Sequence, residues 1–527
     1  MATLTRLLPL LLALLLGACS TATGPLARQP SALPTATPAR PPVLLASTSP
    51  LGGLIDSLYR QPASLWQQLR DELALPVRDD KRVRQQLAWY SKHPSYLDRV
   101  VKRAQPYLWY IRDEVRRRGM PGEIALLPIV ESAYDPFAYS HGRAAGLWQF
   151  IPGTGRRFGL KQNWWYDGRR DLIDSTRAAL DYLELLHRRF KGDWLLALAA
   201  YNSGEGTVMS AVRRNRKKGR PTDFWHLKLP RETRAYVPKL LALAELVRAP
   251  GARGVTLPPV PNEPYFDIVG TGGQIDLAIA ADLMELPLDD LYRLNPGFNQ
   301  WATDPSGPHR LLVPRTHRER FEEALAGLPA DRRVKWIRHK VRKGETLSHI
   351  ARRYHTTTGA LQSANNLRSH RIRAGHHLLV PVAASKTENY RLSAAQRRAS
   401  KQNRARSGSR RSYTVRRGDT LWDIARAHKV GVRSLASWNS MAPGDPLKVG
   451  QRLVIWSKSG RSSHPGSRTR TIHYTVRRGD SLSRISSRFR VSVADLRRWN
   501  RLPKGRYLKP GQRLKLYVDV TRQAGSS

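Results

Sequence analysis

The sequence predicts an α+β multidomain protein, in which a mainly α-helical domain precedes several small β-α-α-β modules. Its 527 residues are enough for roughly three to four domains of ~150 residues each. Between Leu51 and about Leu246, apolar residues recur at intervals of three and four positions, which indicates helices. The C-terminal half instead contains a repeated segment that begins and ends with a β-prone run, so the two halves differ in fold.

The first residues, "MATLTRLLPLLLALLLGACS", predict an export signal over residues 1–18. The apolar run from Leu7 to Leu16 is too short to span the ~30 Å hydrocarbon core of a membrane as a helix. "LGAC" resembles the signal of bacterial lipoproteins, which implies lipidation of Cys19, and Ser20 implies sorting to the outer membrane, facing the periplasm. Cys19 is the one cysteine of the chain, so an internal disulfide framework is excluded. Residues 19–50, rich in Pro, Ala and Thr, predict an extended tether.

We expect an N-terminal helical segment over residues 51–95 and the helical domain itself over residues 96–250. "STRAALDYLELLHRRF" carries the apolar spacing of a helix with one buried face. Gly119, Gly159 and Gly192 follow basic residues or a helix-like run, as glycines at helix ends often do.

Three segments of the C-terminal half align almost without gaps. Each begins with a β-prone run and a Gly-acid turn, as in "YTVRRGDTLWDIA", continues with two short helices, and ends in a closing strand. The first helix carries one apolar stripe, formed by Leu347, Ile350, Ala351 and Tyr354, by Leu421, Ile424, Ala425 and His428, and by Leu482, Ile485, Ser486 and Phe489. In the second helix, Leu361, Leu435 and Leu496 each lie four residues before an asparagine, Asn365, Asn439 and Asn500.

The same spacing predicts a degenerate fourth copy over residues 262–315. Leu277, Leu291 and Asn295 match the repeat, and "RLLVP" supplies a closing strand, although the turn reads "TGGQ". We place the three clear modules at 338–382, 412–456 and 472–518. The Ser-, Arg- and Lys-rich stretches 383–411 and 457–471 between them are expected to be mobile linkers.

The repeat resembles the LysM module, which implies binding of polymers that contain N-acetylglucosamine. By that resemblance, the glycan groove includes the turn after the first strand. The matching positions are Gly344, Glu345, Thr346 and Leu347, then Gly418, Asp419, Thr420 and Leu421, then Gly479, Asp480, Ser481 and Leu482. A structural role remains open for single positions, because Thr420 with Asp423 forms a helix capping box and Gly418 permits a turn. Glycan binding by the first and the degenerate module is left open.

The residues alone make Glu131 a candidate for catalysis, with an ordinary charge at a helix end as the more frequent explanation of such a position. In "LLPIVESAYDPFAYS" it follows an apolar run, a setting that disfavours the charged carboxylate and raises the pKa toward that of a general acid. A helix-end charge would follow an apolar run in the same way.

Three motifs around Glu131 resemble those of the soluble lytic transglycosylase domain. They are "ESAYDPFAYSHGRAAGLWQFIPGTGRRFGL", "ALAAYNSGEGTV" and "LPRETRAYVPKLLAL". The resemblance implies a lysozyme-like catalytic domain with Glu131 as the acid and base, and Trp148 replaces the Met of many members. It implies substrate contacts by Ser132, Gly146, Gln149, Tyr201, Asn202 and Tyr236.

No second carboxylate stands out in the sequence. Asp135 precedes a proline and predicts a turn, and the other acids of the domain follow no comparable apolar run: Asp167, Asp171, Asp174, Glu184 and Glu205. In the lytic transglycosylase reaction that the resemblance implies, the C6 hydroxyl of the muramic residue attacks its own C1, so one acid serves twice. No metal or other cofactor is expected, because the histidines lack metal-ligand spacing, and we expect His141 and His187 to be surface or packing residues.

The sequence therefore predicts a lyase that cleaves the β-1,4 bond between N-acetylmuramic acid and N-acetylglucosamine, leaving 1,6-anhydromuramic ends. A hydrolytic muramidase and a non-catalytic wall anchor remain alternatives. The net charge of +49 favours anionic surroundings, but no nucleic-acid motif accompanies it. The expected partners are peptidoglycan strands and, through the lipid, a membrane; endo or exo action, peptide preference, regulation and oligomeric state are left open.

Overall fold

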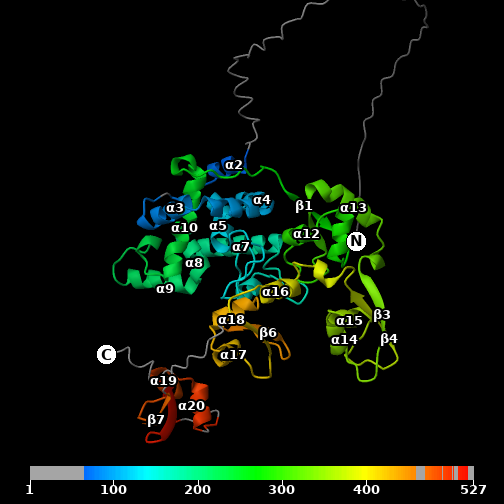
Figure 1. Cartoon of the computed structure of the whole chain (residues 1–527). Coiled ribbons are helices and arrows are strands. Elements are labelled where there is room, and N and C mark those ends of the chain that lie inside the picture. Colours follow the sequence, from blue (N-terminus) through cyan, green and yellow to red (C-terminus); the bar gives the residue numbers. More distant parts are fainter. Residues whose placement is uncertain are drawn as a thin grey trace, which may run out of the picture. The chain divides into compact units, whose positions relative to one another are not determined.

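The computed structural model describes residues 64–76, 78–457, 469–489, 491–500, 502–503 and 508–519 (Figure 1). The expected signal peptide, Cys19 and the tether lie outside the described residues, as does most of the stretch 457–471. In the part of the chain that is described, no helix combines the length and the apolar character that crossing a membrane requires.

The N-terminal part of the structure is built from helices and contains the largest hydrophobic core. In chain order its elements are α2 (Leu65–Asp71), α3 (Lys81–Ser91), α4 (Pro94–Arg117), η1 (Gly122–Leu126), α5 (Leu127–Ser132), α6 (Pro152–Arg157), α7 (Leu172–Arg189), α8 (Trp194–Ser203), α9 (Glu205–Arg216), η2 (Phe224–His226) and α10 (Arg231–Arg248). Helix α8 is apolar along most of its length and packs against α7, α9 and α10. This core confirms the expected mainly helical domain.

Helices α7 and α8 each begin at a capping aspartate. Asp171 accepts a hydrogen bond from the backbone of Asp174 at the start of α7, and Asp193 accepts one from Leu196 at the start of α8. These caps fix the starts of two helices that pack against each other.

Four β-α-α-β modules follow, each with one two-stranded antiparallel sheet. The expected degenerate copy has β1 (Phe266–Gly270), α11 (Leu277–Met284), α12 (Leu288–Leu294) and β2 (Arg310–Pro314). The others comprise β3 (Lys335–Lys340), α14 (Leu347–Arg353), α15 (Thr358–Ala364) and β4 (His377–Val382); β5 (Ser409–Thr414), α17 (Leu421–Ala427), α18 (Val432–Trp438) and β6 (Arg452–Ser457); and β7 (Thr469–Thr475), α19 (Leu482–Phe489), α20 (Val493–Trp499) and β8 (Arg513–Asp519). Between the first two modules lie η4 (Arg315–His317), α13 (Arg318–Ala326) and η5 (Ala330–Arg332).

The asparagine that recurs four residues after a buried leucine joins the second helix to the closing strand. Asn439 is fully buried; its Nδ2 donates to the carbonyls of Leu435 and Val454, both at 2.8 Å, and its Oδ1 accepts from the backbone N–H of Val454 at 2.7 Å. The same three bonds recur at Asn295, Asn365 and Asn500. The repeated asparagine is therefore a structural residue.

We expect Asn439→Ala to destabilise the module of β5 to β6 by about 2 to 4 kcal/mol, because it leaves buried backbone groups of Val454 unpaired. Hydrogen exchange of the full chain should show faster exchange of the Val454 amide. Asn403→Ala, which removes an exposed side chain with one hydrogen bond to Arg410, should leave that amide protected. Equal protection in both variants would contradict the role given to Asn439.

The stretch 383–411, expected to be a mobile linker, carries η6 (Thr387–Asn389) and α16 (Ala394–Asn403). Tyr390 is buried and donates its hydroxyl hydrogen to the carboxylate of Asp276, at 2.9 Å to Oδ1 and 3.0 Å to Oδ2. The backbone N–H of Ala394 donates to the carbonyl of Asn299 at 2.8 Å. Polar composition suggested a linker, but one tyrosine and these long-range bonds hold the segment in place.

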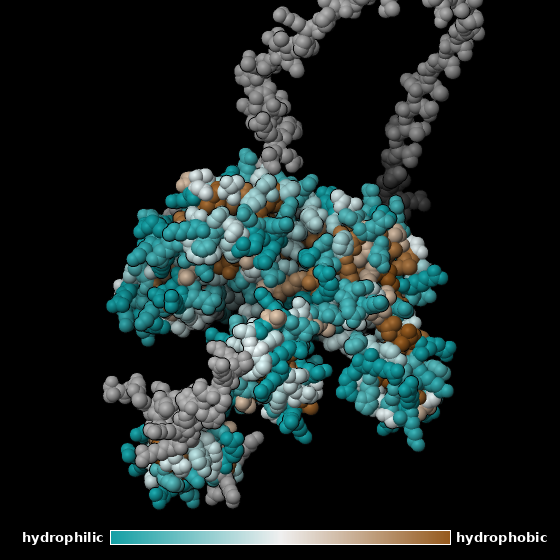
Figure 2. Space-filling view, in the orientation of Figure 1, coloured by the Kyte–Doolittle hydropathy of each residue, from teal (hydrophilic) through white to brown (hydrophobic). Residues whose placement is uncertain are grey.

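Hydrophilic residues cover most of the visible surface (Figure 2). A few large apolar side chains are nevertheless exposed, among them Trp89, Ile151 and Trp422. Ile151 lies at the entrance to α6, next to the cleft described below.

Candidate active site

Glu131 lies in the last turn of the short helix α5, where the chain reverses direction. The helix ends because Ala133 and Tyr134 both adopt left-handed backbone conformations, with φ of 51° and 53°. Tyr134 is fully buried, and its hydroxyl donates to the carbonyl of Ala125 at 2.8 Å. This anchor fixes the end of α5 and with it the position of the Glu131 side chain.

A cleft of about 490 Å³ contains Glu131. Five of the residues expected at the site line it together, namely Glu131, Gln149, Tyr201, Asn202 and Tyr236. They come from α5, from the loop before α6, from α8 and from α10, so the fold brings together positions that are distant in sequence. A cleft of this size accommodates a small part of a polysaccharide.

Burial raises the pKa of Glu131 to about 7 from its ordinary value of 4.5. Desolvation is the largest effect, and the negative charge of Glu232 acts in the same direction. The hydrogen bond from Tyr236 and the positive charge of Lys239 lower the pKa but do not offset desolvation. Near neutral pH, protonated and ionised forms are therefore both abundant. A group of this kind can act both as an acid and as a base.

Tyrosine hydroxyls fix the walls around the carboxyl group. The buried Tyr236 donates to Oε1 of Glu131, and the Tyr201 hydroxyl donates to the carbonyl of Trp148 at 2.9 Å. Thr233 donates to Oδ1 of Asn202 at 2.8 Å, which leaves the amide nitrogen of Asn202 available to a ligand. Burial raises the pKa of both tyrosines well above the ordinary value, so both remain protonated donors.

Ser132 and Gly146, expected to contact substrate, do not line the cleft. The Ser132 hydroxyl lies 3.1 Å from the carbonyl of Pro128 and 3.0 Å from that of Leu147, so it connects two backbone segments. Gly146 has a φ of 80°, and a Cβ built there would lie 2.0 Å from the carbonyl oxygen of Arg169. Both residues position the loop that carries Gln149.

The other carboxylates considered from the sequence are held by structural contacts. Asp135 accepts from the backbone of Phe137 in a turn, and Asp171 caps α7. The remaining four pair with arginines: Asp167 with Arg169 and Arg170, Asp174 with Arg310, Glu184 with Arg118, and Glu205 with Arg189. None of the six lines the cleft around Glu131.

The tryptophans near the motifs are mainly packing residues, as is His187. Trp148 is fully buried and donates to the hydroxyl of Thr176 at 3.0 Å. Trp194 stacks on His187 with ring centroids 4.0 Å apart. His141 is exposed, as expected of a surface histidine.

Glu232 and Lys239, at the first and third turns of α10, also line the cleft and were missed in the sequence. Glu232 lies in the motif "RETRAYV" four residues before Tyr236, so both residues lie on one face of the helix. This spacing from Tyr236 was the sequence signal that could have identified Glu232 as a residue of the site. The structure thus places a second, exposed carboxylate at the rim of the cleft.

In the three clear modules, the turn acids close the turns in which they lie. Asp419 accepts from the backbone of Arg416 at 2.7 Å and from the Tyr413 hydroxyl at 2.8 Å, and Asp480 makes the equivalent contacts. Glu345 accepts from the backbone of Arg342, and its second partner is His339 in place of the tyrosine. Thr420 caps α17 and bonds to Asp423. The turn glycines Gly344, Gly418 and Gly479 have φ between 83° and 89°. These contacts bear out the structural roles that were left open beside glycan binding.

Among the residues that the structure describes, no three His, Cys, Asp or Glu side chains gather as metal ligands would.

Comparison with known proteins adds three matches to family models. The model described as "Transglycosylase SLT domain" matches residues 110–224, the LysM domain matches 339–381, 413–456 and 474–516, and "Lytic transglycosylase MltD, LysM-like domain" matches 265–330.

Two relatives are similar in sequence, one of them over most of this chain. The membrane-bound lytic murein transglycosylase D of Escherichia coli (strain K12) is 39% identical over 403 residues, which are 73% of this chain and 85% of that protein. A putative tributyltin chloride resistance protein of Alteromonas sp. (strain M-1) is 39% identical over 36% of this chain and 90% of its own length. A solved structure of an inactive mutant of the lytic transglycosylase Slt from Pseudomonas aeruginosa is 26% identical, with a TM-score of 0.22 over 28% of this chain and 24% of that one.

Proposed function

Because the chain belongs to the family of membrane-bound lytic murein transglycosylase D, we propose that Glu131 performs both proton transfers of its reaction. The protein is a lytic murein transglycosylase, a lyase that acts on peptidoglycan. The observation that supports the assignment of Glu131 is its buried carboxyl group in the cleft, with a pKa near 7 and a hydrogen bond from Tyr236.

In the first step, protonated Glu131 donates its proton to the glycosidic oxygen between the muramic residue and the next N-acetylglucosamine. The bond from C1 to that oxygen breaks, and the oxygen leaves as the free hydroxyl of the departing sugar. Positive charge develops at C1. We assign the orientation of the sugar to the amide of Asn202 and the hydroxyl oxygen of Tyr201, because both residues line the cleft.

In the second step, the C6 hydroxyl oxygen of the same muramic residue bonds to C1, and its proton passes to ionised Glu131. The acid is regenerated, no water is consumed, and the product ends in a 1,6-anhydro ring. Holding the hydroxyl in line with C1 makes the attack intramolecular, which can contribute about 7 to 11 kcal/mol to lowering the barrier. A second essential carboxylate is unnecessary in this scheme.

Digestion of purified sacculi tests this proposal. Mass spectrometry of the released muropeptides should show muramic ends one water lighter than reducing ends. Reducing muramic ends as the main product would contradict it.

The position of Glu232 in the same cleft as Glu131 favours the alternative, a hydrolytic muramidase. Two carboxylates in one cleft could serve as the acid and the base of hydrolysis. In our scheme Glu232 only adjusts the pKa of Glu131. Glu232→Gln should therefore keep most activity and move the alkaline limb of the pH profile to lower pH, since removing a negative neighbour lowers the pKa of Glu131.

Lys239→Gln is the matched variant with the opposite expected shift, because removing the positive charge raises the pKa of Glu131. The alkaline limb of the pH profile should then move to higher pH. Rates of sacculus solubilisation between pH 5 and 9 measure both shifts, with Glu131 assigned to the alkaline limb. Loss of activity by several orders of magnitude in Glu232→Gln would support the hydrolytic alternative.

The LysM modules bind the same polymer as the catalytic domain, so several weak contacts raise the local concentration of glycan. We assign this binding to the turns at Gly344 to Leu347, Gly418 to Leu421 and Gly479 to Leu482. The high positive charge favours residence near anionic wall and lipid.

The protein acts in the cell envelope, as its membrane-bound relative does. We propose that it is an outer-membrane lipoprotein facing the periplasm, anchored through Cys19. Cys19→Ser should move the protein from the membrane fraction to the soluble fraction, and retention in the outer membrane would contradict the anchor.

A further inference from the structure

A second cavity, of about 1020 Å³, adjoins the cleft and is strongly basic. Ser140 lines both cavities, so the two share a wall at the loop between α5 and α6. Eight arginine and lysine side chains line the larger cavity against three aspartates. We call it the basic cavity.

The three aspartates of the basic cavity are already engaged by protein groups. Asp167 accepts from Arg169 and Arg170 at 2.7 to 2.8 Å. Asp445 accepts from the Tyr139 hydroxyl at 2.8 Å and pairs with Arg143 at 2.8 Å, and Asp135 closes its own turn. These contacts leave most of the positive charge of the cavity without a carboxylate.

Arg397, on α16, is one of the cations that line the basic cavity. Its guanidinium lies 4.4 Å from the ring centroid of Phe137 and donates to the carbonyl of Leu392 at 2.5 Å. The described residues place no carboxylate within ion-pair distance of it. Burial, and to a smaller extent the neighbouring charge of Arg170, lowers the pKa of Arg397 to about 9. The group remains charged at neutral pH, and an anion beside it would relieve this unfavourable environment.

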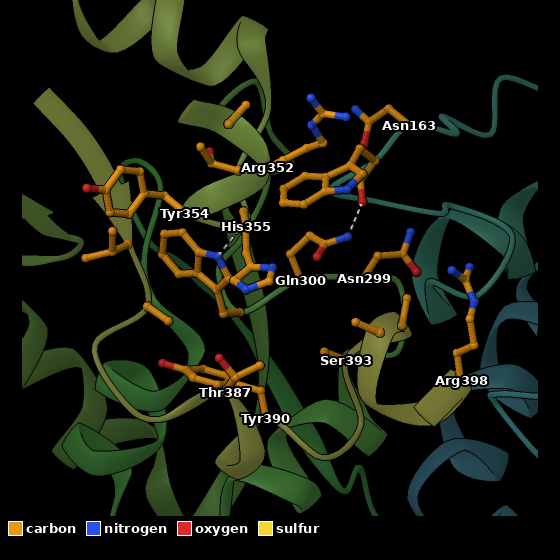
Figure 3. A pocket seen from close by; sticks show the side chains of 18 of the residues that line it. Asn163, Asn299, Gln300, Arg352, Tyr354, His355, Thr387, Tyr390, Ser393 and Arg398 are labelled. Atoms are coloured by element: carbon orange, nitrogen blue, oxygen red, sulfur yellow. Dashed lines mark hydrogen bonds between the residues drawn. The ribbon is translucent and has the colours of Figure 1, made fainter. Parts of the chain in front are cut away.

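Further donors surround the same space. Nε of Arg170 is buried and has no hydrogen-bond partner among the described residues. Arg398 and Lys401 lie on the same helix as Arg397 and also line the cavity. A third cavity, of about 950 Å³, is drawn in Figure 3. Asn299, Arg352 and Arg398, labelled there, line both this third cavity and the basic cavity.

We propose that the basic cavity binds the carboxylates of the peptide stem carried by the muramic residue in the cleft. This inference rests on the proposed function, since it takes the glycan strand in the cleft as given. A muramic residue carries its peptide on the lactyl group, and that peptide is acidic. The shared wall at Ser140 places the basic cavity next to the glycan, and forked arginines suit carboxylates. The stem would thus contribute to choosing which glycan positions are cut.

The test compares glycan strands that carry uncross-linked stems with strands stripped of peptide. Replacing both Arg397→Gln and Arg398→Gln in the full chain should lower kcat/KM on stem-bearing strands about tenfold, as expected for the loss of charge-assisted hydrogen bonds. The rate on stripped strands should stay unchanged. Lys401→Gln is a second variant. The Lys401 side chain is exposed and bonds to no other side chain among the described residues, so its replacement should lower kcat/KM on stem-bearing strands to a smaller extent.

Arg404→Gln, just beyond α16 and outside the cavity lining, is the matched control and should leave both rates unchanged. An equal loss on both substrates in the double variant, or no loss on stem-bearing strands, would overturn the inference. If the proposed function itself fails, the wild type produces no anhydro ends on either substrate, which distinguishes the two failures.

A binding measurement on the Glu131→Gln chain completes the test. The free tetrapeptide stem should bind, with an affinity that falls as salt rises, and the same peptide with its carboxylates amidated should not. Equal binding of the amidated peptide, or equally tight binding of inorganic phosphate, would mean that the cavity does not select stem carboxylates.

Discussion

Replacing Glu131 with Gln is expected to lower the rate of glycan cleavage by about 10³- to 10⁴-fold, because both proton transfers depend on this one carboxyl group. The amide keeps the size of the side chain, and its oxygen can still accept the hydrogen bond from Tyr236. Release of muropeptides from sacculi measures the loss. Glu184→Gln, on the surface of α7, should keep the wild-type rate, and retained activity in Glu131→Gln would exclude the proposed role.

The same variant should be more stable than the wild type at alkaline pH. Glu131 has a pKa of about 7 in the fold against 4.5 when exposed, so the folded state binds more protons than the unfolded state between these values. Stability from this group is therefore lost as pH rises through that window. Glu131→Gln removes the penalty, and we expect a gain of about 1 to 3 kcal/mol at pH 8 and little change near pH 4. Denaturant unfolding at both pH values would show this difference.

Gly146→Ala is expected to destabilise the catalytic domain by about 3 to 5 kcal/mol. The left-handed φ of 80° disfavours any Cβ, and the new atom would lie 2.0 Å from the backbone oxygen of Arg169, which cannot rotate away. Activity should fall as well, because Gln149 donates to the Gly146 carbonyl at 2.8 Å and lines the cleft.

Gly153→Ala is the matched control for this change. Gly153 lies in α6, and a Cβ there would meet no atom within 4 Å. Alanine favours a helix over glycine, so this variant should be as stable as the wild type or slightly more so. Equal stability of both alanine variants in thermal unfolding would contradict the packing described for Gly146.

The module fold could be predicted from sequence because its signals are local and repeated. Leu435 and Asn439 keep a fixed spacing in all copies, and the degenerate copy around Asn295 was found by that spacing alone. The function of the asparagine was not visible, because its partner at Val454 lies fifteen residues away on another element.

Only part of the candidate site could be predicted from the sequence. The apolar run before Glu131 predicted its raised pKa. Its assignment as the catalytic acid came from the three motifs around it. Glu232 and the basic side of α16 were missed, because only the tertiary fold brings α10 to the cleft and Arg397 to Phe137. Ser132 and Gly146 adjoin functional residues in sequence, but their contacts are with backbone.

Digestion of sacculi in water labelled with heavy oxygen tests the central claim most directly. If the C6 hydroxyl attacks C1 with Glu131 as its only acid and base, wild-type products carry no label at C1 of the muramic end and are one water lighter than reducing ends. Label at that C1 in products collected at the earliest times would show that water is the nucleophile, and would contradict the account.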